Sequence, residues 1–199
     1  MSARGKMRLI LAGVIGLQGC AGVPTQFYSL EATAPTPAVQ ERPVSAPPLI
    51  GVTQMTLPNV LERKQITARD TQGELVIFEQ HQWAGLLKQN MTEVMTKNLS
   101  NLYPQLWFKA YPWSTLGMVD YRLVIDVTQL TVVMGKTIMF AADWTLIDEK
   151  THAVIAHEPI SLERPLQDNT VPQVVAQLNQ LLTEFAQTLS LSPRLRLKP

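Results

Sequence analysis

Large apolar residues recur every three or four positions in two stretches of the chain, which is the spacing of an amphipathic helix. The first stretch spans 81–102 and ends at Tyr103-Pro104, because proline disfavours the helical conformation of the residue before it. The second spans 170–189 and begins with Thr170 and Gln173 in the arrangement of a capping box. We therefore expect two long helices, each with one buried face.

Alternating apolar and polar residues predict three strands in the second half of the chain. The segments 120–134 and 136–148 are separated by Gly135, which suits a tight hairpin turn, and 152–163 follows after a short polar turn. Together they predict an antiparallel meander. Pro159 has no backbone N–H to donate, so we place the last strand at an edge of the sheet or at a bulge.

Shorter apolar runs predict the remaining strands. The segments 49–57 and 106–111 are typical of single strands, whereas 65–69 and 74–78 flank a turn-rich tetrapeptide and predict a hairpin. Strands, a helix, a meander and a second helix together predict an α+β fold. We expect one twisted, mostly antiparallel β-sheet with two long amphipathic helices packed on one face.

The first twenty residues follow another pattern, that of an export signal. Residues 1–8 carry basic side chains and no acid, and the apolar run 9–17 follows. This run is too short to cross a bilayer, which takes about 20 apolar residues, but it suits a signal peptide. The ending Gly19-Cys20 resembles the lipobox of bacterial lipoproteins, although Gln18 stands where that motif usually has Ala, Ser or Thr. We predict a lipoprotein signal peptide over 1–19.

Cys20 would then carry the lipid anchor, while an ordinary secretory signal followed by an accidental cysteine is the alternative. Acyl chains on Cys20 and on its new amino group would hold the domain on a membrane, because each buried CH₂ contributes about 0.8 kcal/mol. The residue after Cys20 is Ala21. An Asp at this position would resemble an inner-membrane retention signal. Delivery to the outer membrane of a Gram-negative cell, on its periplasmic face, is therefore expected.

The segment after the cysteine divides into a tether and a docking strand. Residues 31–48 are rich in proline and poor in large apolar side chains, so they predict an extended loop. Either all of 21–48 is one tether, or Phe27–Leu30 docks as a strand, and we favour docking because the aromatic pair needs burial. We then expect a lipidated cysteine and short tether over 20–26, a single domain over 27–192 and a basic tail over 193–199.

Composition and charge exclude several classes of protein. The sequence is 46% hydrophobic and 17% charged, which argues against wholesale disorder. Arg4, Lys6 and Arg8 lie in the predicted signal, so 14 basic and 16 acidic residues remain and the net charge is −2. Nucleic acid is therefore not an expected partner, because phosphates require clustered cations. The single cysteine allows no intrachain disulfide.

The sequence shows no arrangement of residues that indicates catalysis. His81, His152 and His157 lack the spacing of a metal site, and no nucleotide-binding loop or serine-hydrolase motif occurs. Ser161 lies near His157, but ordinary strand hydroxyls explain it better than a triad does. We therefore predict no catalytic residue, no metal and no cofactor, and we expect a protein that is not an enzyme.

The tryptophans offer a weaker signal for lipid binding. Trp83 and Trp144 fit core positions, whereas Trp107 and Trp113 bracket a loop and are open candidates for an aromatic-walled groove. The basic tail could contact anionic head groups, although a solvated chain end is the favoured interpretation.

Several short motifs, taken in order, resemble one known family. After the lipobox-like ending come Phe27-Tyr28-Ser29-Leu30, a proline-rich gap, Ile50-Gly51-Val52, Leu57-Pro58-x-x-Leu61-x-Arg63-x-Gln65-Ile66, Trp83-Ala84 and Asn98-Leu99. This order resembles the ABC-type transport auxiliary lipoprotein family, of which PqiC-like proteins are the best-known members. Phe27 departs from the tyrosine that is common there. The resemblance covers nearly all of the chain beyond the signal.

The resemblance implies a non-enzymatic role in moving lipids between membranes. The protein would be an auxiliary or docking subunit, anchored in the outer membrane, of an MCE-type, PqiABC-like system that supports envelope integrity. Its partners would be an MCE-domain transport protein and the associated membrane subunits, and a homo-oligomer is expected by family likeness only.

The candidate contact with such a partner is the segment 57–65. Leu57, Pro58, Asn59 and Arg63 in this loop are not explained by strand packing, although a structural turn with Arg63 in an ion pair explains them equally well. The alternative function is a stand-alone periplasmic lipid-binding lipoprotein, which predicts a cavity between the sheet and the helices.

Overall fold

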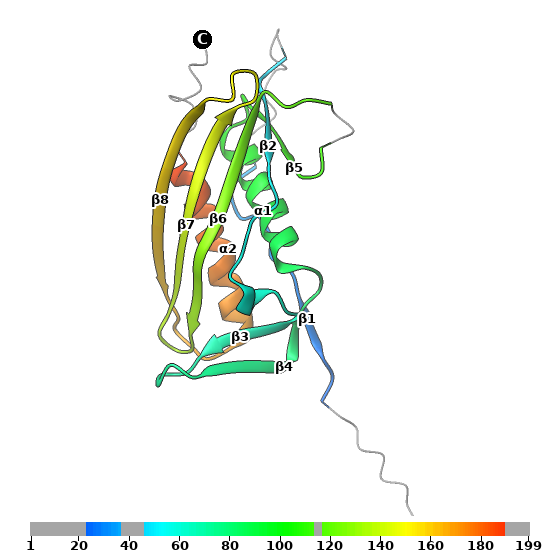
Figure 1. Cartoon of the computed structure of the whole chain (residues 1–199). Coiled ribbons are helices and arrows are strands. Elements are labelled where there is room, and N and C mark those ends of the chain that lie inside the picture. Colours follow the sequence, from blue (N-terminus) through cyan, green and yellow to red (C-terminus); the bar gives the residue numbers. More distant parts are fainter. Residues whose placement is uncertain (1–22, 37–45, 114–116, 190–199) are drawn as a thin grey trace, which may run out of the picture.

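The computed structural model describes residues 23–36, 46–113 and 117–189, so the predicted signal peptide, Cys20 and the basic tail lie outside the described residues. The fold is α+β, with one open eight-stranded sheet and two helices (Figure 1). The strands are β1 Gln26–Tyr28, β2 Leu49–Val52, β3 Gln65–Arg69, β4 Leu75–Trp83, β5 Trp107–Ala110, β6 Tyr121–Val133, β7 Thr137–Asp148 and β8 Val154–Pro165. The helices are α1 Leu87–Leu102 and α2 Val171–Thr188, and Asn59–Leu61 form the short 3₁₀ helix η1.

The predicted meander is confirmed as the antiparallel strands β6, β7 and β8. Gly135 lies in the β6–β7 turn with a φ of 65°, a conformation that favours glycine. Phe140 and Trp144, which lie on the same face of β7, are 1% and 2% exposed. The strand β8 pairs only with β7, so Pro159 does lie in an edge strand, where its missing N–H does no harm.

The other edge of β6 makes the sheet mixed. Here β2 pairs in parallel with β6 and with β5, and β3 pairs in parallel with β6 where Arg69 lies opposite Val133. The sheet is still mostly antiparallel, as predicted, because its long ladders are antiparallel. In Figure 1, β2 and β5 lie near one end of the long meander, and β1, β3 and β4 lie near the other.

The predicted strand over 49–57 is too long, because β2 ends at Val52. Beyond it the chain turns inward, and the buried Met55 donates its backbone N–H to the Thr92 hydroxyl of α1 at 2.9 Å. Only an isolated parallel bridge between Thr56 and Asp126 resumes the pairing with β6. A contact with the helix thus replaces a strand contact.

The predicted start of the first helix at residue 81 is wrong, since α1 begins at Leu87. Residues 81–83 extend β4, which was expected to end at residue 78. The backbone N–H of Trp83 donates to the carbonyl of Lys64 at 2.7 Å, and β1 pairs in parallel along 81–83. Pairing with two distant segments therefore overrides the helical spacing of these residues.

The predicted capping box of the second helix is also wrong, although α2 covers nearly the expected residues. The Thr170 side chain makes no capping hydrogen bond, and its hydroxyl donates to a carboxylate oxygen of Asp168 at 2.7 Å. The side-chain oxygen of Gln173 instead accepts the backbone N–H of Asp168 at 2.8 Å. Asp168 thus engages both side chains before the helix begins.

Docking of the segment after the tether is confirmed, because β1 pairs in parallel with β4. The proline-rich stretch 31–48 forms no strand or helix where it is described, but it is not wholly superficial. Ala34 is 5% exposed, its N–H donates to the side-chain oxygen of Asn98 at 3.1 Å, and its carbonyl accepts from Asn101 at 2.9 Å. Residues 37–45 of this stretch lie outside the described part.

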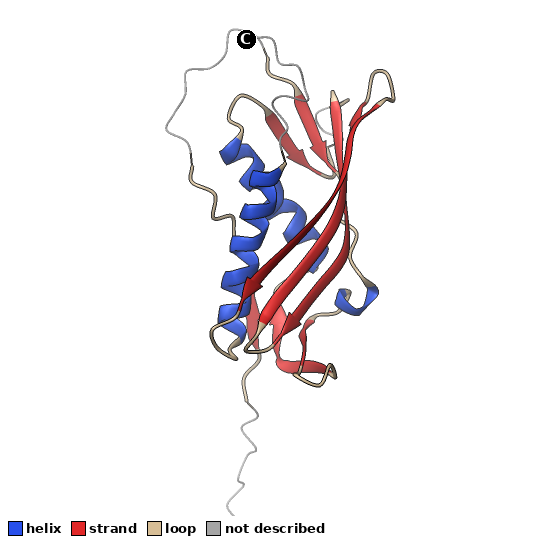
Figure 2. Cartoon of the chain, turned by 90° about the vertical axis from the view of Figure 1, so that its left-hand side faces the viewer, coloured by secondary structure: helices blue, strands red, loops and turns tan. Residues whose placement is uncertain are grey.

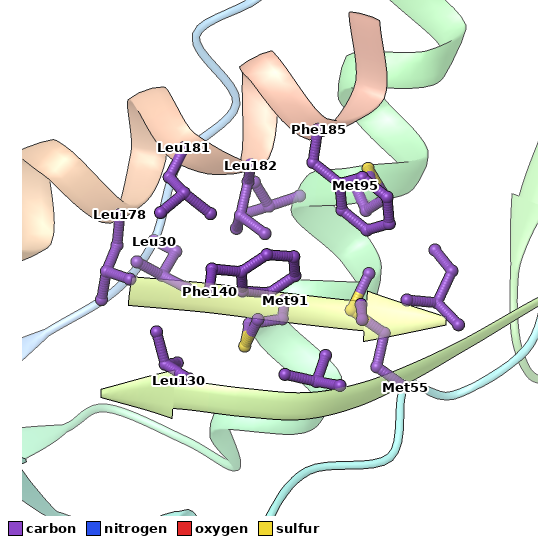
Figure 3. Close-up of a cluster of buried hydrophobic side chains, with 14 of the residues drawn as sticks. Leu30, Met55, Met91, Met95, Leu130, Phe140, Leu178, Leu181, Leu182 and Phe185 are labelled. Carbon is purple, nitrogen blue, oxygen red and sulfur yellow. The ribbon is translucent and has the colours of Figure 1, made fainter. Parts of the chain in front are cut away.

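The core lies where the two helices meet each other and the meander (Figures 2 and 3). Phe140 of β7 and Phe185 of α2 pack with their ring centroids 5.3 Å apart. Met91 and Met95 of α1 are no more than 1% exposed and complete this cluster. Helix α2 is thereby packed against β7, and α1 against α2.

Candidate functional site

A groove of about 720 Å³ lies where β1, the segment 57–64 and the connection from β4 to α1 meet. We call it the β1 groove, and its volume falls within the range of about 300–1,000 Å³ that is usual for ligand sites. Its lining residues are Phe27, Leu57, Leu61, Glu62, Arg63, Lys64 and residues 82–88.

A tight turn builds one wall of the β1 groove. Pro58 cannot donate a backbone hydrogen bond, and its carbonyl accepts the N–H of Leu61 at 2.9 Å, which closes the η1 turn. The turn brings Leu57 and Leu61 to the same wall, and Leu57 is only 9% exposed. The hydrogen bond between Lys64 and Trp83 then fixes the end of this segment to β4.

The connection from β4 to α1 builds the opposite wall. Leu86 is the N-cap of α1, in an extended conformation and without a capping hydrogen bond from its side chain. Leu87 is 5% exposed, whereas Leu86 is 62% exposed. Phe27 of β1 adds a second exposed apolar side chain, at 66%. The groove therefore has a buried apolar floor and an exposed apolar rim.

The lining of the groove also contains charged side chains, and more of them are basic than acidic. The carboxylate of Glu62 and the ammonium of Lys88 lie 2.8 Å apart, across the two walls. Arg63 and Lys64 are exposed, and neither forms an ion pair with another residue in the described part of the chain. One acid and three bases leave the lining with a net charge of +2.

The comparison with protein families decides the identity. The family model of the ABC-type transport auxiliary lipoprotein component matches residues 28–190, which include the segment 57–64 and both helices. The chain belongs to this family. No match was found among curated proteins.

Solved structures share the fold of this auxiliary lipoprotein. A crystal structure of an uncharacterized protein covers 86% of this chain and 99% of its own, with 18% sequence identity and a TM-score of 0.69. A Xanthomonas campestris protein of the DUF330 family covers 83% of this chain and 92% of its own, with 17% identity and a TM-score of 0.66. At such identity the likeness establishes the fold alone.

The predicted contact residues of the auxiliary lipoprotein divide between the β1 groove and the turn beside it. Leu57 and Arg63 line the groove, whereas Pro58 and Asn59 belong to the neighbouring η1 turn. Among the described residues Arg63 forms no ion pair, so the interpretation of Arg63 as one partner of an ion pair gains no support there, and it is Glu62 that pairs with Lys88.

Phe27, Leu86 and Lys88 are among the lining residues that sequence reasoning did not single out. Leu86 fitted the apolar stripe of the expected helix, but it precedes the first helical turn and is exposed. Phe27 was expected to be buried together with Tyr28. Successive residues of a strand point to opposite faces, and only Tyr28 turns inward, where its hydroxyl lies 2.8 Å from Nδ1 of His81. Strand alternation was the signal that would have separated the two.

His81 and His157 of the auxiliary lipoprotein serve local structure. His81 contacts Tyr28 and Phe78, and Nδ1 of His157 lies 2.9 Å from the hydroxyl of Thr145 on the neighbouring strand. Within the described ranges no group of three or more His, Cys, Asp or Glu side chains is placed to hold a metal ion. Likewise, neither described helix has the length and apolar character that crossing a bilayer requires.

Two shifted pKa values lie at the other end of the molecule, where β6 meets β7. Burial raises the pKa of Tyr121, and the nearby carboxylates of Asp148 and Asp120 raise it further. The backbone N–H of Thr151 lowers the pKa of Asp148, because a hydrogen bond to the carboxylate favours its charged form. Tyr121 and Asp148 face each other across β6 and β7, and neither residue lines the β1 groove.

The four tryptophans divide into two buried core residues and two residues outside the core. Trp83 and Trp144 are core residues, as predicted, at 7% and 2% exposure. Trp107 on β5 is 51% exposed, and Trp113 packs edge-to-face on Tyr111, with ring centroids 5.5 Å apart. Neither of these two lines the β1 groove.

Between the sheet and the helices, the described part of the chain encloses a small hollow. This space, next to Leu130 and Leu178, has a volume of about 20 Å³, which is room for about one water molecule. It is far too small for the lipid that the stand-alone carrier was expected to enclose there. A hollow with the volume of a ligand site is instead found in the β1 groove.

Proposed function

We propose that this transport auxiliary lipoprotein is a non-catalytic docking subunit of an MCE-type intermembrane lipid transport system, anchored at the periplasmic face of the outer membrane through Cys20. The family match over residues 28–190 is the observation that carries the proposal, because the family is one of auxiliary components of ABC-type transport. The MCE-domain protein, its associated membrane subunits and self-association belong to the proposal.

The anchor would place the β1 groove close to the membrane. Phe27 follows Cys20 by seven positions, and a chain of this length reaches about 25 Å at full extension. Val23 and Phe27, the apolar residues of the described chain nearest to Cys20, are 70% and 66% exposed. Such side chains are suited to an apolar neighbour such as the bilayer surface.

The turn that follows Leu57 is our proposed contact with the transport partner. Asn59 and Arg63 are exposed, and Val60 between them is 37% exposed. Interfaces combine an apolar centre with arginine and a polar rim, and this turn offers all three. Leu57 and Pro58 would act by holding the turn in shape, since Leu57 is nearly buried.

Anchoring is tested by labelling cells with radioactive palmitate and separating inner from outer membranes. We expect label in the wild-type protein in the outer-membrane fraction, and none in Cys20→Ala, which removes the only thiol of the chain. An unlabelled wild-type protein, or one confined to the inner membrane, would contradict the anchoring proposal.

Docking is tested separately by photocrosslinking in cells. A photoreactive amino acid at Asn59 or Arg63 should crosslink to an MCE-domain protein, whereas the same amino acid at Val154, an exposed position on β8, should not. Equal crosslinking from all three positions, or none from Asn59 and Arg63, would count against this contact surface.

A further inference from the structure

We propose that the β1 groove binds one acyl chain of an anionic phospholipid, with the lipid phosphate held by Arg63 and Lys64. This inference deepens the proposed function, on which it rests for the position of the groove beside a membrane. It assigns a lipid site to the end of the molecule next to β1 and not to the interior between the sheet and the helices.

The walls of the groove provide the apolar environment that an acyl chain requires. Leu57, Trp83 and Leu87 line the groove and are at most 9% exposed, so a ligand there contacts packed apolar side chains. Phe27 and Leu86 remain largely exposed at the rim. A chain laid between them would remove their surfaces from water, which is the favourable process that drives apolar binding.

Charge complementarity selects an anionic lipid over a neutral one. Lys88 is already neutralised by Glu62 at 2.8 Å, which leaves Arg63 and Lys64 as the cations of the lining without an ion pair among the described residues. A guanidinium binds phosphate oxygens in a bidentate manner, and an ammonium adds a second charge. Apolar walls beside two such cations match a ligand with an acyl chain and a phosphate.

The position of the groove in the chain points to the membrane as the source of this lipid. The wall formed by Phe27 lies only seven positions after the proposed anchor, so the groove and the bilayer are held within the reach of a short tether. A lipid could therefore pass between bilayer and groove without crossing bulk water. A peptide of the partner, or the acyl chains of the anchor, would be competing occupants.

The chain offers variants that separate a filled groove from a misfolded protein. Gly85 lines the groove, its φ lies outside the range that demands glycine, and a Cβ added there meets no atom within 4 Å. We therefore use Gly85→Trp to introduce a bulky side chain at the groove, at a position where the added Cβ has open space. Leu86→Glu places a negative charge at the exposed rim and serves as a second variant.

The charge of the rim is tested with a matched pair of double variants. Arg63→Glu with Lys64→Glu reverses the two free cations, and Lys97→Glu with Lys109→Glu makes the same change in net charge at exposed positions of α1 and β5. Circular dichroism and thermal unfolding of each variant establish that it is folded.

The experiment uses the full lipoprotein, purified from membranes and reconstituted into phosphatidylcholine vesicles. These vesicles contain a small fraction of phosphatidylglycerol with a photoreactive group in one acyl chain, and the labelled peptides are mapped by mass spectrometry. We expect label within residues 57–64 and 82–88, and its near loss in Gly85→Trp and in Leu86→Glu. The Arg63/Lys64 reversal should weaken labelling by roughly tenfold, whereas the Lys97/Lys109 reversal should leave it unchanged.

Several outcomes would overturn the inference. These are label spread evenly over exposed apolar residues such as Trp107 and Met118, label unaffected by Gly85→Trp and Leu86→Glu, and equal losses in the two charge reversals. An unlabelled wild-type protein would show that the groove does not take up bilayer lipid. The vesicles contain no MCE protein, so these results stand apart from the crosslinking of Asn59 and Arg63, and either proposal can fail alone.

Discussion

The carboxylate of Glu62 and the ammonium of Lys88 form an ion pair 2.8 Å long that joins the two walls of the β1 groove. Glu62 follows the η1 turn, and Lys88 lies in the first turn of α1. The pair therefore links a loop that the sequence marks as irregular to the start of a helix. It also leaves Arg63 and Lys64 as the charges available to a ligand.

This ion pair should orient the loop more than it stabilises the fold. The side chains are 43% and 32% exposed, and exposed pairs contribute about 0.2–1 kcal/mol. A double-mutant cycle with Glu62→Ala and Lys88→Ala, followed by urea unfolding, should give a coupling energy below about 1 kcal/mol that shrinks as salt is added. A larger coupling that is insensitive to salt would contradict this assignment.

The hydrogen bond that the Asn98 side chain accepts should hold the chain around Ala34 against α1. Asn98 is fully buried, and its side-chain oxygen accepts the N–H of Ala34 at 3.1 Å. Asn98→Ala leaves that N–H without its partner and should lower the free energy of unfolding by about 1–3 kcal/mol. Hydrogen exchange at the Ala34 amide should also become faster.

The control for this prediction is Lys97→Ala, one position earlier on the exposed face of α1. It should change the free energy of unfolding by no more than about 0.5 kcal/mol. Equal effects of the two substitutions would show that residues 31–36 are not held in this way.

Gly135 should be required by the β6–β7 turn, where its φ is 65°. Alanine in that conformation is strained, so Gly135→Ala should lower the free energy of unfolding by about 1–2 kcal/mol. The nearest obstacle to the added Cβ is the exposed side chain of Asn169, which can move aside. Gly85→Ala, at a position without positive φ or neighbours, should be neutral or slightly stabilising in the same thermal unfolding experiment.

Asp148 should make stability depend on pH in the acidic range. Its carboxylate accepts the N–H groups of Thr151 and Lys150 at 2.8 and 2.9 Å, and its pKa is lowered below the ordinary 3.8. A lowered folded-state pKa stabilises the protein above the unfolded-state pKa, and this stabilisation is lost as pH falls through the folded-state value. Asp148→Asn should therefore unfold at a lower temperature than the wild type at neutral pH.

The difference in melting temperature between Asp148→Asn and the wild type should shrink at pH values below 3.8. Melting curves measured by circular dichroism across this range provide the test. A difference that stays constant with pH would show that the lost stability comes from the shape of the turn and not from the charge.

Local patterns in the sequence determined the elements whose partners are close along the chain. The β6–β7–β8 meander and the β3–β4 hairpin follow from alternation and turn residues, because antiparallel neighbours need only a short connection. The body of both helices follows from apolar spacing in the same way. The motif around Leu57 and Arg63 also pointed to the segment that forms one wall of the groove.

Only the tertiary structure decided the parallel pairings and the site that depends on them. The pairing of β1 with β4 joins residues more than fifty positions apart, and it draws residues 81–83 out of the expected helix. Gly51 also depends on a residue distant in sequence. The indole of Trp113 lies 3.1 Å from where a Cβ of residue 51 would stand. The physical reason is that spacing records which side of an element is apolar, whereas the choice of neighbour is made by distant segments that compete for the same backbone hydrogen bonds.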